Sequence, residues 1–413
     1  MKITVHRGTR EIGGTCIQLS IAKTTILLDL GLPLSSQSKE LDVGTLKPDA
    51  VIISHSHQDH YGLIDQLHTD VPVYIGEVAK GLIDATGMFL GKALHTNTFR
   101  HFKSWQPFTV GDFTITPYLM DHSAVDAYGF LIEAERKKIY YSGDFRATGR
   151  KYKLFDNMVK MPPKDIDLLF LEGTMLQRNS DTFPAEKSVE AKISEILQRQ
   201  RNISFIISSS QNIDRIVSAH RACKRAGKLL VIDIYTAWIL EQVRRVSIKV
   251  PAMEWDEVRI YADYGFNKRL KEQPNYFEDF RRRLYKRRVR WKELISSPSD
   301  YLYFGRMSSF RKIQAFRGEE PVNVIYSQWE GYLKGTNKDY FGAEQMAAMR
   351  HDPHVNFVYA HTSGHATVED LKRFAQALQA KRLVPVHTEY GDVYRDLFGK
   401  SVVVLQDGET LEI

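Results

Sequence analysis

The sequence predicts an α/β protein in which a strand-rich unit, divided into two pieces of sequence, carries an inserted unit of alternating strands and helices. Three observations predict this arrangement. Short strand patterns separated by glycine turns fill the first part of the chain, long helical periods alternate with apolar strands in the middle, and strands accompanied by histidines return near the end. We therefore expect the strand-rich unit at residues 1–175 and 356–413, and the inserted α/β unit with its parallel sheet at residues 176–355.

The individual elements follow from the same patterns. In the first piece, short apolar or alternating runs bounded by turn residues predict strands at residues 2–6, 16–20, 25–29, 50–54, 73–75, 113–117, 128–133, 138–142 and 168–172. In the insertion, helical periodicity predicts helices at residues 186–199, 214–226 and 236–246, with strands at 204–208 and 228–233. In the last piece we expect a strand at 356–360, a helix at 367–380, a strand at 383–387 and a hairpin-like segment at 402–413.

The composition is that of an ordinary globular protein, with 43% hydrophobic and 26% charged residues. No run of about 18 apolar residues occurs, so a membrane-spanning helix is not expected. Cys16 and Cys223 lie far apart in the sequence and lack a Cys-x-x-Cys partner, which is typical of buried thiols in a reducing compartment. Because the N-terminus also lacks an apolar secretion segment, we expect a cytoplasmic protein with no membrane partner.

Residues 55–60 read His-Ser-His-Gln-Asp-His and directly follow a buried-type strand, which would place them at a strand end. His55 and His57 can point to one side of an extended turn, and the adjacent Asp59 and His60 can reach a second cation as the chain enters a helix. The alternatives are a polar surface turn and an adventitious clamp for transition metals. Three imidazoles and a carboxylate so close together are costly to bury without a metal or a charge partner, so the spacing predicts a two-metal site.

Two further strand ends offer metal ligands. His122 and Asp144 each follow a predicted strand, and they can converge from neighbouring strands of one sheet. An aspartate can bridge two cations, since each carboxylate oxygen can take one ion. Taken alone, each of these residues is more often structural. Asp29 closes another strand and could orient the ligands by accepting hydrogen bonds, or it could be an ordinary turn aspartate.

These residues resemble the motifs of the metallo-β-lactamase hydrolase superfamily, in order and in spacing. The motifs are Asp29, His55-x-His57-x-Asp59-His60, His122 and Asp144. Three later residues resemble the beta-CASP nuclease branch: Glu172 in Leu-Glu-Gly-Thr, His365 in Ser-Gly-His-Ala and His387 in Pro-Val-His-Thr-Glu. Residues 361–366 and 209–215 are most similar to ribonuclease J. The resemblance covers essentially the whole chain and implies an αββα sandwich interrupted by an inserted α/β beta-CASP domain.

The resemblance also implies a role for each matching residue. One zinc ion would be held by His55, His57, His122 and Asp144, and the other by Asp59, His60, His387 and the shared Asp144, with manganese as an alternative metal. The two ions would activate water for attack on the scissile phosphorus, and Asp59 would help to orient that water. His365 would protonate the leaving oxygen, positioned by Glu172.

Contacts with a substrate phosphate are implied for His361, Ser363, Gly364 and Ala366, which lead into the helix predicted at residues 367–380. A glycine-containing turn at a helix N-terminus offers free N–H groups to an anion, so the physics agrees. Ser209, Asn212 and Arg215 have the same arrangement at the start of another helix, where simple capping by Asn212 is an equal alternative.

The chain departs from the family pattern in two places. Thr388 stands where the family usually shows glycine after the final histidine. The sequence also stops soon after the second metal-domain piece, so we expect no counterpart of the C-terminal domain of bacterial ribonuclease J, and the oligomeric state is left open. His387 favours RNA as the substrate, because DNA-processing members of the branch tend to lack a histidine there.

The positive charge is concentrated in one stretch. Residues 268–294 contain eleven Lys and Arg against four Asp and Glu, an excess equal to the +7 of the whole chain. Five aromatic residues interrupt the cations, an arrangement suited to single-stranded nucleic acid: Tyr276, Phe277, Phe280, Tyr285 and Trp291. The alternative is a helix whose aromatic residues pack inward and whose charges are merely solvated.

The sequence therefore predicts a two-zinc ribonuclease that hydrolyses single-stranded RNA, as a 5′-to-3′ exonuclease, an endonuclease or both. Three alternatives stay open. The metal motifs also fit a DNA nuclease or a small-molecule hydrolase of the thioesterase or lactonase type, although the insertion and the pair formed by Glu172 and His365 have no evident use in the latter. A non-catalytic RNA-binding module is the third, and the intact ligand set speaks against it.

Overall fold

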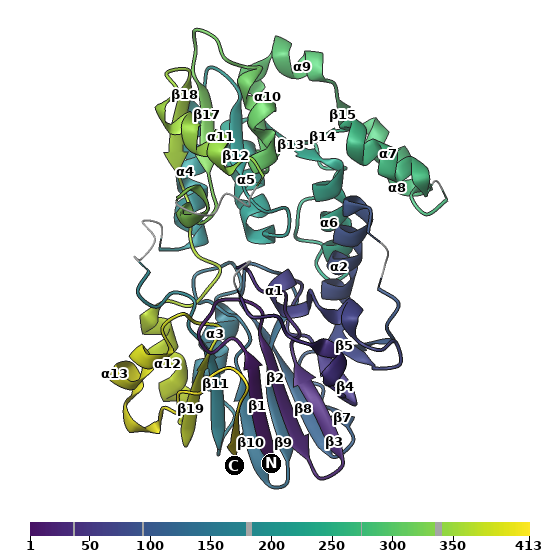
Figure 1. The fold of residues 1–413 in the computed structure, drawn as a ribbon. Coiled ribbons are helices and arrows are strands. Elements are labelled where there is room, and N and C mark those ends of the chain that lie inside the picture. The colour runs from purple at the N-terminus through teal and green to yellow at the C-terminus, as the bar shows by residue number, and fades with distance from the viewer. Residues whose placement is uncertain (36–37, 93–94, 179–183, 274, 335–340) are drawn as a thin grey trace. The chain divides into compact units, whose positions relative to one another are not determined.

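The computed structural model describes residues 1–35, 38–92, 95–178, 184–273, 275–334 and 341–413 of this chain. They form two compact units (Figure 1). Unit 1 contains Met1–Asp84, Leu94–Ser180 and Gly364–Ile413, and unit 2 contains Ala85–Ala93 and Asp181–Ser363. The predicted insertion includes positions outside the described residues, namely 179–183, 274 and 335–340.

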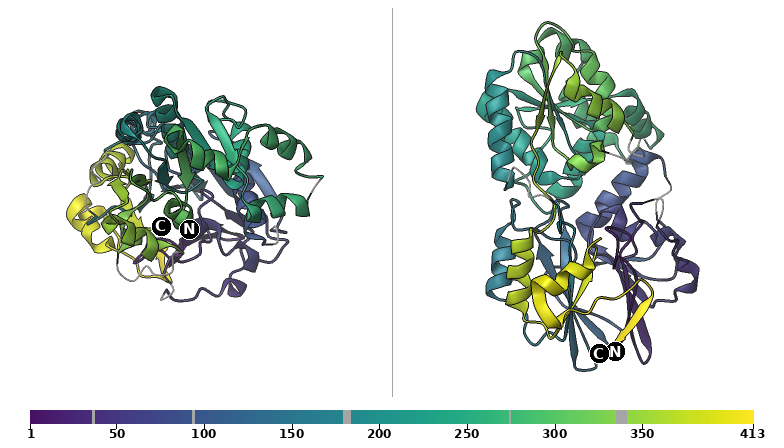
Figure 2. Two further views of the ribbon diagram at one scale, coloured as in Figure 1. Left: turned by 90° about the horizontal axis from the view of Figure 1, so that it is seen from above. Right: turned by 60° about the vertical axis from the view of Figure 1, so that its left-hand side comes forward.

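Unit 1 is built on two β-sheets. In spatial order, the described strands of the first sheet are β20 (Glu409–Glu412), β1 (Lys2–Arg7), β2 (Cys16–Ile21), β3 (Thr24–Leu28), β4 (Ala50–Ile52), β5 (Val73–Gly76) and β6 (Phe99–Phe102). Those of the second sheet are β19 (Arg382–Val386), β11 (Leu168–Glu172), β10 (Lys137–Tyr141), β9 (Ala127–Ala134), β8 (Phe113–Met120) and β7 (Phe108–Val110). Because β20 pairs with β1, the two chain ends lie side by side, as Figure 2 shows, and the N-terminal amine of Met1 donates to the carbonyl oxygen of Ile413 at 3.2 Å.

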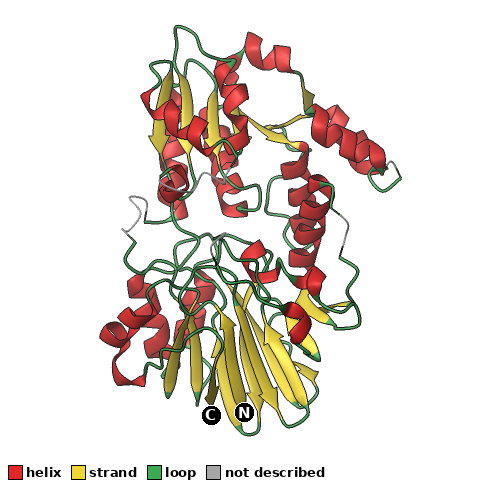
Figure 3. Ribbon diagram, viewed as in Figure 1, coloured by secondary structure: helices red, strands yellow, loops and turns green. Residues whose placement is uncertain are grey.

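The two sheets pack face to face, and helices cover their outer faces (Figure 3). Alternate residues of both sheets, including Ile3, Ile17, Ile115 and Phe130, are fully buried in one shared core. Burying each such side chain contributes about 1.5–3 kcal/mol. The outer face of the first sheet packs against α1 (Gln58–Tyr61) and the first turns of α2 (Glu77–Leu90), and that of the second sheet against α3 (Lys153–Lys160), α12 (Val368–Leu378) and α13 (Tyr394–Phe398). These four layers are the predicted αββα sandwich.

Strand direction brings several strand ends to one edge of unit 1. Strands β10, β11 and β19 pair in parallel, with Ile139 opposite Leu168 and Glu172 opposite Val386. Strands β3 and β4 also pair in parallel in the other sheet. Parallel strands end at the same edge of a sheet, so residues that follow these strands can meet.

Unit 2 contains one sheet whose described strands all run parallel. In spatial order they are β15 (Arg288–Val289), β14 (Val258–Tyr261), β13 (Leu229–Asp233), β16 (Tyr301–Gly305), β12 (Ser204–Ile207), β17 (Val322–Tyr326) and β18 (Val355–Tyr359). The helices of this unit are α4 (Glu186–Arg199), α5 (Ile213–Ala226), α6 (Ile234–Arg244), α7 (Tyr264–Glu272), α8 (Glu278–Lys286), α9 (Trp291–Ser296), α10 (Phe310–Gln314) and α11 (Ala343–Ala348). The predicted fold class, a sandwich with an inserted α/β unit, is confirmed.

Side-chain caps explain where three helices of unit 2 begin. Asn212, Asp233 and Asp263 precede α5, α6 and α7, and each side chain accepts a hydrogen bond from the backbone N–H three residues later. Such caps satisfy N–H groups that have no partner inside the helix. At the other end of α5, Gly227 adopts φ 63°, a left-handed conformation that glycine takes without strain.

Three expectations about the chain's organisation are corrected. Strand β18 pairs in parallel with β17, with Val322 opposite Val355, so it belongs to unit 2 rather than to the piece predicted to begin at residue 356. Residues 85–93 also belong to unit 2. The hairpin expected at 402–413 is absent from this described segment, because Val402 bridges to Leu383 and β20 pairs with β1. In the described part of the chain, no helix combines the length and apolar character that a membrane crossing needs.

Candidate metal centre

All seven predicted metal ligands come together in unit 1, at the edge where the strands end. In four overlapping groups, one ligand atom from each residue lies within 4.8 Å of those of the others, so each group could hold a metal ion. The groups are His55 with His57 and His122, His55 with His60 and Asp144, Asp59 with His60 and His387, and His122 with Asp144 and His365. The first and third groups correspond to the two ligand sets that the sequence predicts.

One carboxylate oxygen lies between these groups. Oδ2 of Asp144 is 3.1 Å from Nε2 of His60 and 3.7 Å from Nε2 of His387. The same oxygen is 3.8 Å from Nε2 of His55 and 4.0 Å from Nε2 of His122. A carboxylate in this position can be shared by two cations, as predicted for Asp144.

The polar atoms of the cluster fit a pair of metal ions. Nε2 of His55, Nε2 of His387 and Oδ1 of Asp144 are buried and have no hydrogen-bond partner in the described part of the chain. A buried polar atom without a partner costs about 1–3 kcal/mol. The other ring nitrogens are held in place, His55 Nδ1 by Ser54 Oγ at 3.0 Å and His387 Nδ1 by Thr15 Oγ1 at 3.0 Å. Divalent cations would satisfy the inward-facing atoms, and a set of imidazoles and carboxylates suits zinc.

Burial keeps most of the imidazoles neutral. It lowers the pKa of His57 to about 4 and lowers the pKa of His55 and His122 well below the usual value of histidine. Burial also lowers the pKa of His387. Because neutral imidazole is the form that binds metals, these side chains need not lose a proton before they bind.

Asp29 holds His60 in place, as the sequence suggested. Its Oδ2 lies 2.7 Å from His60 Nδ1 and accepts a hydrogen bond from the Tyr141 hydroxyl at 2.6 Å, while its Oδ1 accepts from the Ser54 N–H at 2.7 Å. Burial opposes a charge on His60, but the carboxylates of Asp144 and Asp29 outweigh it and raise the pKa of His60 well above its usual value. Sequence reasoning missed Ser54 and Tyr141, although both stand close to predicted ligands in the chain.

The substitution Asp29→Asn is expected to lower zinc affinity roughly 10- to 100-fold, because His60 loses the charged acceptor that orients its ring. Asparagine tolerates the left-handed backbone of this residue, φ 57°, so the fold should survive. A competition titration of zinc against a chelator measures the affinity. Asp49→Asn is the matched control, since that carboxylate accepts from the Thr25 N–H at 2.7 Å at the other end of β3. Equal affinity for both variants would contradict the role of Asp29.

His365 stands beside the cluster with a carboxylate partner. Its Nδ1 lies 3.3 Å from Oε1 of Glu172 and 3.7 Å from Oδ2 of Asp144. Glu172 is buried at the end of β11, where the N–H groups of Phe145 and Ala366 donate to it, both at 3.3 Å. Burial opposes a charge on His365, but Glu172 and Asp144 raise its pKa above the usual value. With 20% of its side chain exposed, His365 can pass a proton to a bound molecule.

Two close backbone approaches in the centre require glycine. A Cβ on Gly31 would lie 1.7 Å from the carbonyl oxygen of Asp59, which no rearrangement of a side chain could relieve. A Cβ on Gly364 would lie 2.5 Å from Ser123 Oγ, and the Gly364 carbonyl accepts from Nδ1 of His122 at 2.6 Å. Gly364 therefore helps to orient His122, a candidate metal ligand, and the sequence analysis did not assign this role to it.

A buried ion pair that the sequence analysis missed joins two ligand loops. Asp121 directly precedes His122, Arg146 lies two residues after Asp144, and both side chains of the pair are fully buried. Arg146 Nε lies 3.5 Å from Asp121 Oδ1, and the Gly149 N–H donates to Asp121 Oδ2 at 2.9 Å. The sequence offered one signal for this pair, because Asp121 and Arg146 each stand within two residues of a predicted metal ligand.

Thr388, which departs from the family pattern, does not displace the neighbouring candidate ligand His387. Thr388 is buried, and its side chain lies 2.9 Å from where a Cβ on Gly173 would stand. Its hydroxyl accepts a hydrogen bond from the Tyr390 N–H at 3.1 Å. The space left by Gly173 thus accommodates Thr388, and the preceding His387 stays among the clustered residues.

The residues predicted to contact phosphate divide between the two units. Ser209, Asn212, Arg215, His361 and Ser363 belong to unit 2, whereas Gly364 and Ala366 belong to unit 1. Ser209 is exposed and Ser363 is half-buried, so phosphate contacts of both stay predictions. His361 is half-buried, with Nδ1 3.2 Å from the Ser327 carbonyl oxygen, and its contact also stays a prediction.

Arg215 and Asn212 are corrected as phosphate contacts. The Arg215 side chain is fully buried, and its guanidinium donates to Glu186 Oε1 at 2.9 Å, to the Ser327 carbonyl at 2.7 Å and to the Thr362 carbonyl at 3.4 Å. Its charge is thus used inside unit 2, where it supports the backbone around Thr362. The Asn212 side chain accepts a hydrogen bond from the Arg215 N–H at 3.2 Å. Asn212 thus caps helix α5, as the alternative interpretation of the sequence had it.

The N–H group of Ala366 is also committed, because it donates to Glu172. This contact corrects the expectation that it binds a phosphate. The prediction that Gly364 binds a phosphate through its N–H group stays open, because the described contact with His122 uses the Gly364 carbonyl oxygen.

In the basic stretch, most of the aromatic residues pack inward. Phe277 and Phe280 are 2% and 3% exposed, and their rings contact that of Trp238 with centroids 4.8 and 4.9 Å apart. Trp291 packs against Phe316 with centroids 5.1 Å apart. The inward-packing alternative is therefore correct for Phe277 and Phe280, which are too buried to stack on bases, whereas Trp291 is half-buried. Tyr276 and Tyr285 stay exposed, at 58% and 39%.

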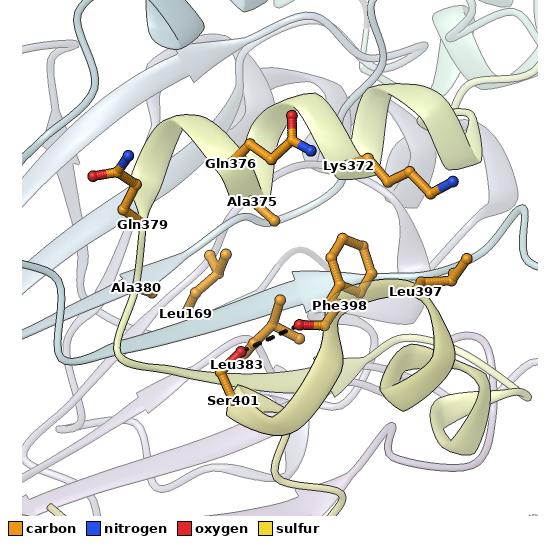
Figure 4. Close-up of a pocket in the computed structure, with 10 residues that line it drawn as sticks. All are labelled: Leu169, Lys372, Ala375, Gln376, Gln379, Ala380, Leu383, Leu397, Phe398 and Ser401. Atoms are coloured by element: carbon orange, nitrogen blue, oxygen red, sulfur yellow. Dashed lines mark hydrogen bonds between the residues drawn. The ribbon is translucent and has the colours of Figure 1, made fainter.

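A pocket of about 250 Å³ in unit 1 lies apart from the metal centre (Figure 4). Its lining includes Leu169 and Leu383, near the starts of β11 and β19, whereas Glu172 and His387 lie at the other ends of those strands. Residues of α12 and α13, together with Gln379, Ala380 and Ser401 from the segments that follow these helices, complete the lining. The pocket is therefore not part of the candidate centre.

Comparisons with known proteins agree with the geometry. Residues 24–231 match the family model described as "Beta-lactamase superfamily domain", and residues 354–400 match "Zn-dependent metallo-hydrolase RNA specificity domain". The chain is 22% identical to Ribonuclease J of Helicobacter pylori over 100% of its own length and 61% of that protein. It is 22% identical to Ribonuclease J of Mycoplasma pneumoniae, covering 94% of the chain and 68% of the relative, and 28% identical to Probable RNase MJ4 of Methanocaldococcus jannaschii, covering 65% and 70%.

The fold has a full-length counterpart among solved structures. A crystal structure of a protein of unknown function from Enterococcus faecalis superposes with a TM-score of 0.78 and 20% identity, covering 99% of both chains. The chain spans about three fifths of the length of the Helicobacter pylori relative. The first family model covers half of the sequence, and the predicted ligands gather at the edge of unit 1 where several strands end. The chain therefore belongs to the metallo-β-lactamase superfamily, and it is similar to the ribonuclease J branch of that superfamily.

Proposed function

We propose that this protein hydrolyses phosphodiester bonds of single-stranded RNA with two divalent metal ions, of which zinc is the first choice. One observation carries the proposal: Oδ2 of Asp144 lies 3.1–4.0 Å from histidine nitrogens that belong to two different candidate ligand groups. One group would consist of His55, His57 and His122, the other of Asp59, His60 and His387, with Asp144 shared. Two-metal centres with a shared carboxylate are typical of phosphodiester hydrolysis.

The proposal divides the reaction among residues of this chain. Bound cations would neutralise the phosphate charge and lower the pKa of a water molecule. Asp59 accepts a hydrogen bond from the attacking water and orients it toward the phosphorus. His365 donates its proton to the leaving oxygen as the bond between phosphorus and that oxygen breaks. Glu172, 3.3 Å from Nδ1 of His365, positions that ring.

Two findings support RNA as the substrate class rather than DNA or a small thioester or lactone. The segment 354–400, which contains both His365 and His387, matches a domain described as specifying RNA. Relatives that match the whole chain or nearly all of it bear the name Ribonuclease J. The pair formed by Glu172 and the partly exposed His365 fits any substrate with an alkoxide leaving group, which needs a proton, and so does not distinguish RNA from DNA.

Purified protein is expected to cleave single-stranded RNA in the presence of zinc or manganese, to lose this activity in EDTA and to regain it when metal is restored. The substrates are a 3′-labelled RNA with a 5′-monophosphate, its 5′-hydroxyl twin, and DNA of the same sequence. Mononucleotides released mainly from the phosphorylated RNA would identify a 5′-to-3′ exonuclease, and internal fragments from both RNAs an endonuclease. A metal-loaded, monodisperse preparation that leaves RNA and single-stranded DNA intact would refute the proposal.

A further inference from the structure

The cations at the end of the basic stretch point in two directions within unit 2. Arg283 and Arg287 are turned toward carboxylates. The Arg283 guanidinium lies 2.7 Å from Glu241 and 2.6 Å from Glu254, and the Arg287 guanidinium lies 3.1 Å from Asp256. The charges of these two arginines are therefore neutralised by the protein itself.

Their neighbours Lys286, Arg288, Arg290 and Lys292 behave differently, and we name these four residues the basic stripe. All four are exposed, and within the described part of the chain none of them forms an ion pair. The residue in the middle, Val289, is only 4% exposed. The half-buried Arg283 and Arg287 are thus neutralised by carboxylates, whereas the four residues of the basic stripe face solvent without ion-pair partners among the described residues.

The backbone arranges part of this row like a strand. Arg288 begins β15, which ends the sheet and pairs with β14 alone, and Arg290 is extended, with φ −93° and ψ 154°. Because Val289 points inward, Arg288 and Arg290 point to the same outer side. Residues two apart on a strand are about 6.6 Å apart. This interval is comparable with that of successive phosphates along an extended single strand.

An aromatic face stands beside the row. Tyr285 is 39% exposed, and the guanidinium carbon of Arg288 lies 5.9 Å from the centre of its ring. The Tyr285 hydroxyl donates to Asn267 Oδ1 at 2.8 Å, which fixes the orientation of the ring. An exposed tyrosine next to an arginine offers a stacking surface for a base.

We infer that the basic stripe and Tyr285 bind single-stranded RNA at the sheet edge of unit 2, as a surface additional to the metal centre; the inference rests on the proposed function for the identity of the ligand. The cations contact successive phosphates, and Tyr285 stacks on a base. A run of charges is usually a solvated face. Here the shared positive charge of the four residues, the strand-like interval between Arg288 and Arg290, and the neighbouring ring of Tyr285 together match a nucleic-acid strand. The nearby Glu293 carboxylate is engaged by the Arg290 N–H at 2.7 Å.

The test measures binding of a fluorescent single-stranded RNA in EDTA, so that cleavage cannot interfere. The variant Lys286→Gln/Arg288→Gln/Arg290→Gln/Lys292→Gln is expected to bind more weakly, with the slope of log affinity against log salt reduced by about 2–3, since each phosphate contact on a single strand contributes about 0.7. Tyr285→Leu is expected to weaken binding roughly tenfold and to leave the slope unchanged, because stacking releases no counterions.

Two controls distinguish the effect of the basic stripe from the effects of lower net charge and of misfolding. Lys23→Gln/Lys47→Gln/Lys103→Gln/Lys164→Gln removes the same charge from four exposed lysines of unit 1, and it should bind RNA nearly as the wild type does. Arg288→Lys/Arg290→Lys keeps the charge and should retain the salt slope. Equal weakening by the two quadruple variants, or wild-type binding by the variant of the basic stripe, would overturn the inference.

Poly-glutamate serves as the probe for an acidic protein partner. If the variant of the basic stripe loses binding to poly-glutamate while it binds RNA like the wild type, the surface serves such a partner and the inference is wrong. Cleavage assays keep the two proposals apart. Failure of the wild type to cut any RNA would refute the proposed function, whereas the binding measurement in EDTA judges the basic stripe independently of cleavage.

Discussion

Replacing Asp144 by asparagine is expected to abolish cleavage, lowering the rate more than about 10³-fold, the range seen when one member of a catalytic unit is removed. Oδ2 of Asp144 lies within 4.0 Å of nitrogens from both candidate ligand groups, so its loss would affect both proposed metal ions at once. An amide in its place presents a neutral oxygen and cannot offset the charge of two cations. Elemental analysis should therefore also show less bound metal per chain.

The matched control for Asp144→Asn is Asp126→Asn. Asp126 is a half-buried carboxylate of the same unit, and it accepts from the Ala79 N–H at 2.9 Å and from the Tyr128 hydroxyl at 2.7 Å. This control loses hydrogen bonds of similar kind but should keep its metal and most of its activity. Thermal unfolding of both variants shows whether each is folded. Full metal content and wild-type cleavage in Asp144→Asn would rule out a shared ligand.

Replacing His365 by alanine is expected to lower kcat on RNA by about 10²–10⁴-fold, the usual contribution of a general acid, while the metal content stays unchanged. The reason is that Nδ1 of His365 lies 3.3 Å from Glu172 Oε1, and that 20% of the His365 side chain is exposed. A substrate whose leaving group needs no proton, bis(p-nitrophenyl) phosphate, should lose far less activity. Glu172→Gln should reduce kcat on RNA in the same selective way, to a smaller extent.

His68→Ala is the control for His365, because that histidine has 77% of its side chain exposed and belongs to the same unit. It should retain full activity on both substrates. The comparison of substrates decides the role. If His365→Ala loses RNA and bis(p-nitrophenyl) phosphate activity equally, His365 acts in metal binding or folding rather than as the acid.

Local patterns were sufficient to predict most strands of this protein and the helices α4, α5, α6 and α12, whereas α2, α3, α7–α11 and α13 were not predicted. The helix at 186–199 and the strand at 168–172 have the predicted bounds, because apolar periodicity and turn residues act over a few residues. The boundary near residue 356 could not be predicted in this way. Strand β18 has no local feature that distinguishes its two possible sheets, and only its pairing with β17 assigns it to unit 2.

In the candidate metal centre, too, some residues could be predicted from the sequence and others could not. The ligand types were readable because histidines and aspartates follow strands, where side chains can gather at one sheet edge. Tyr141, Ser54 and the pair of Asp121 and Arg146 were not predicted, because each acts through a contact with a residue distant in sequence. Conversely, Arg215 looked suitable for phosphate until its burial beside Glu186 was known.

By itself, the sequence determined the fold class, the candidate metal-ligand set and the concentration of positive charge, since these depend on residue type and spacing along the chain. Only the tertiary structure decided which charges are free to act. It neutralises Arg283 and Arg287 and leaves Arg288 and Arg290 exposed without ion-pair partners among the described residues, although all four lie within one short segment. The physical reason is that burial and the nearness of an opposite charge arise from packing between distant segments, which no local pattern records.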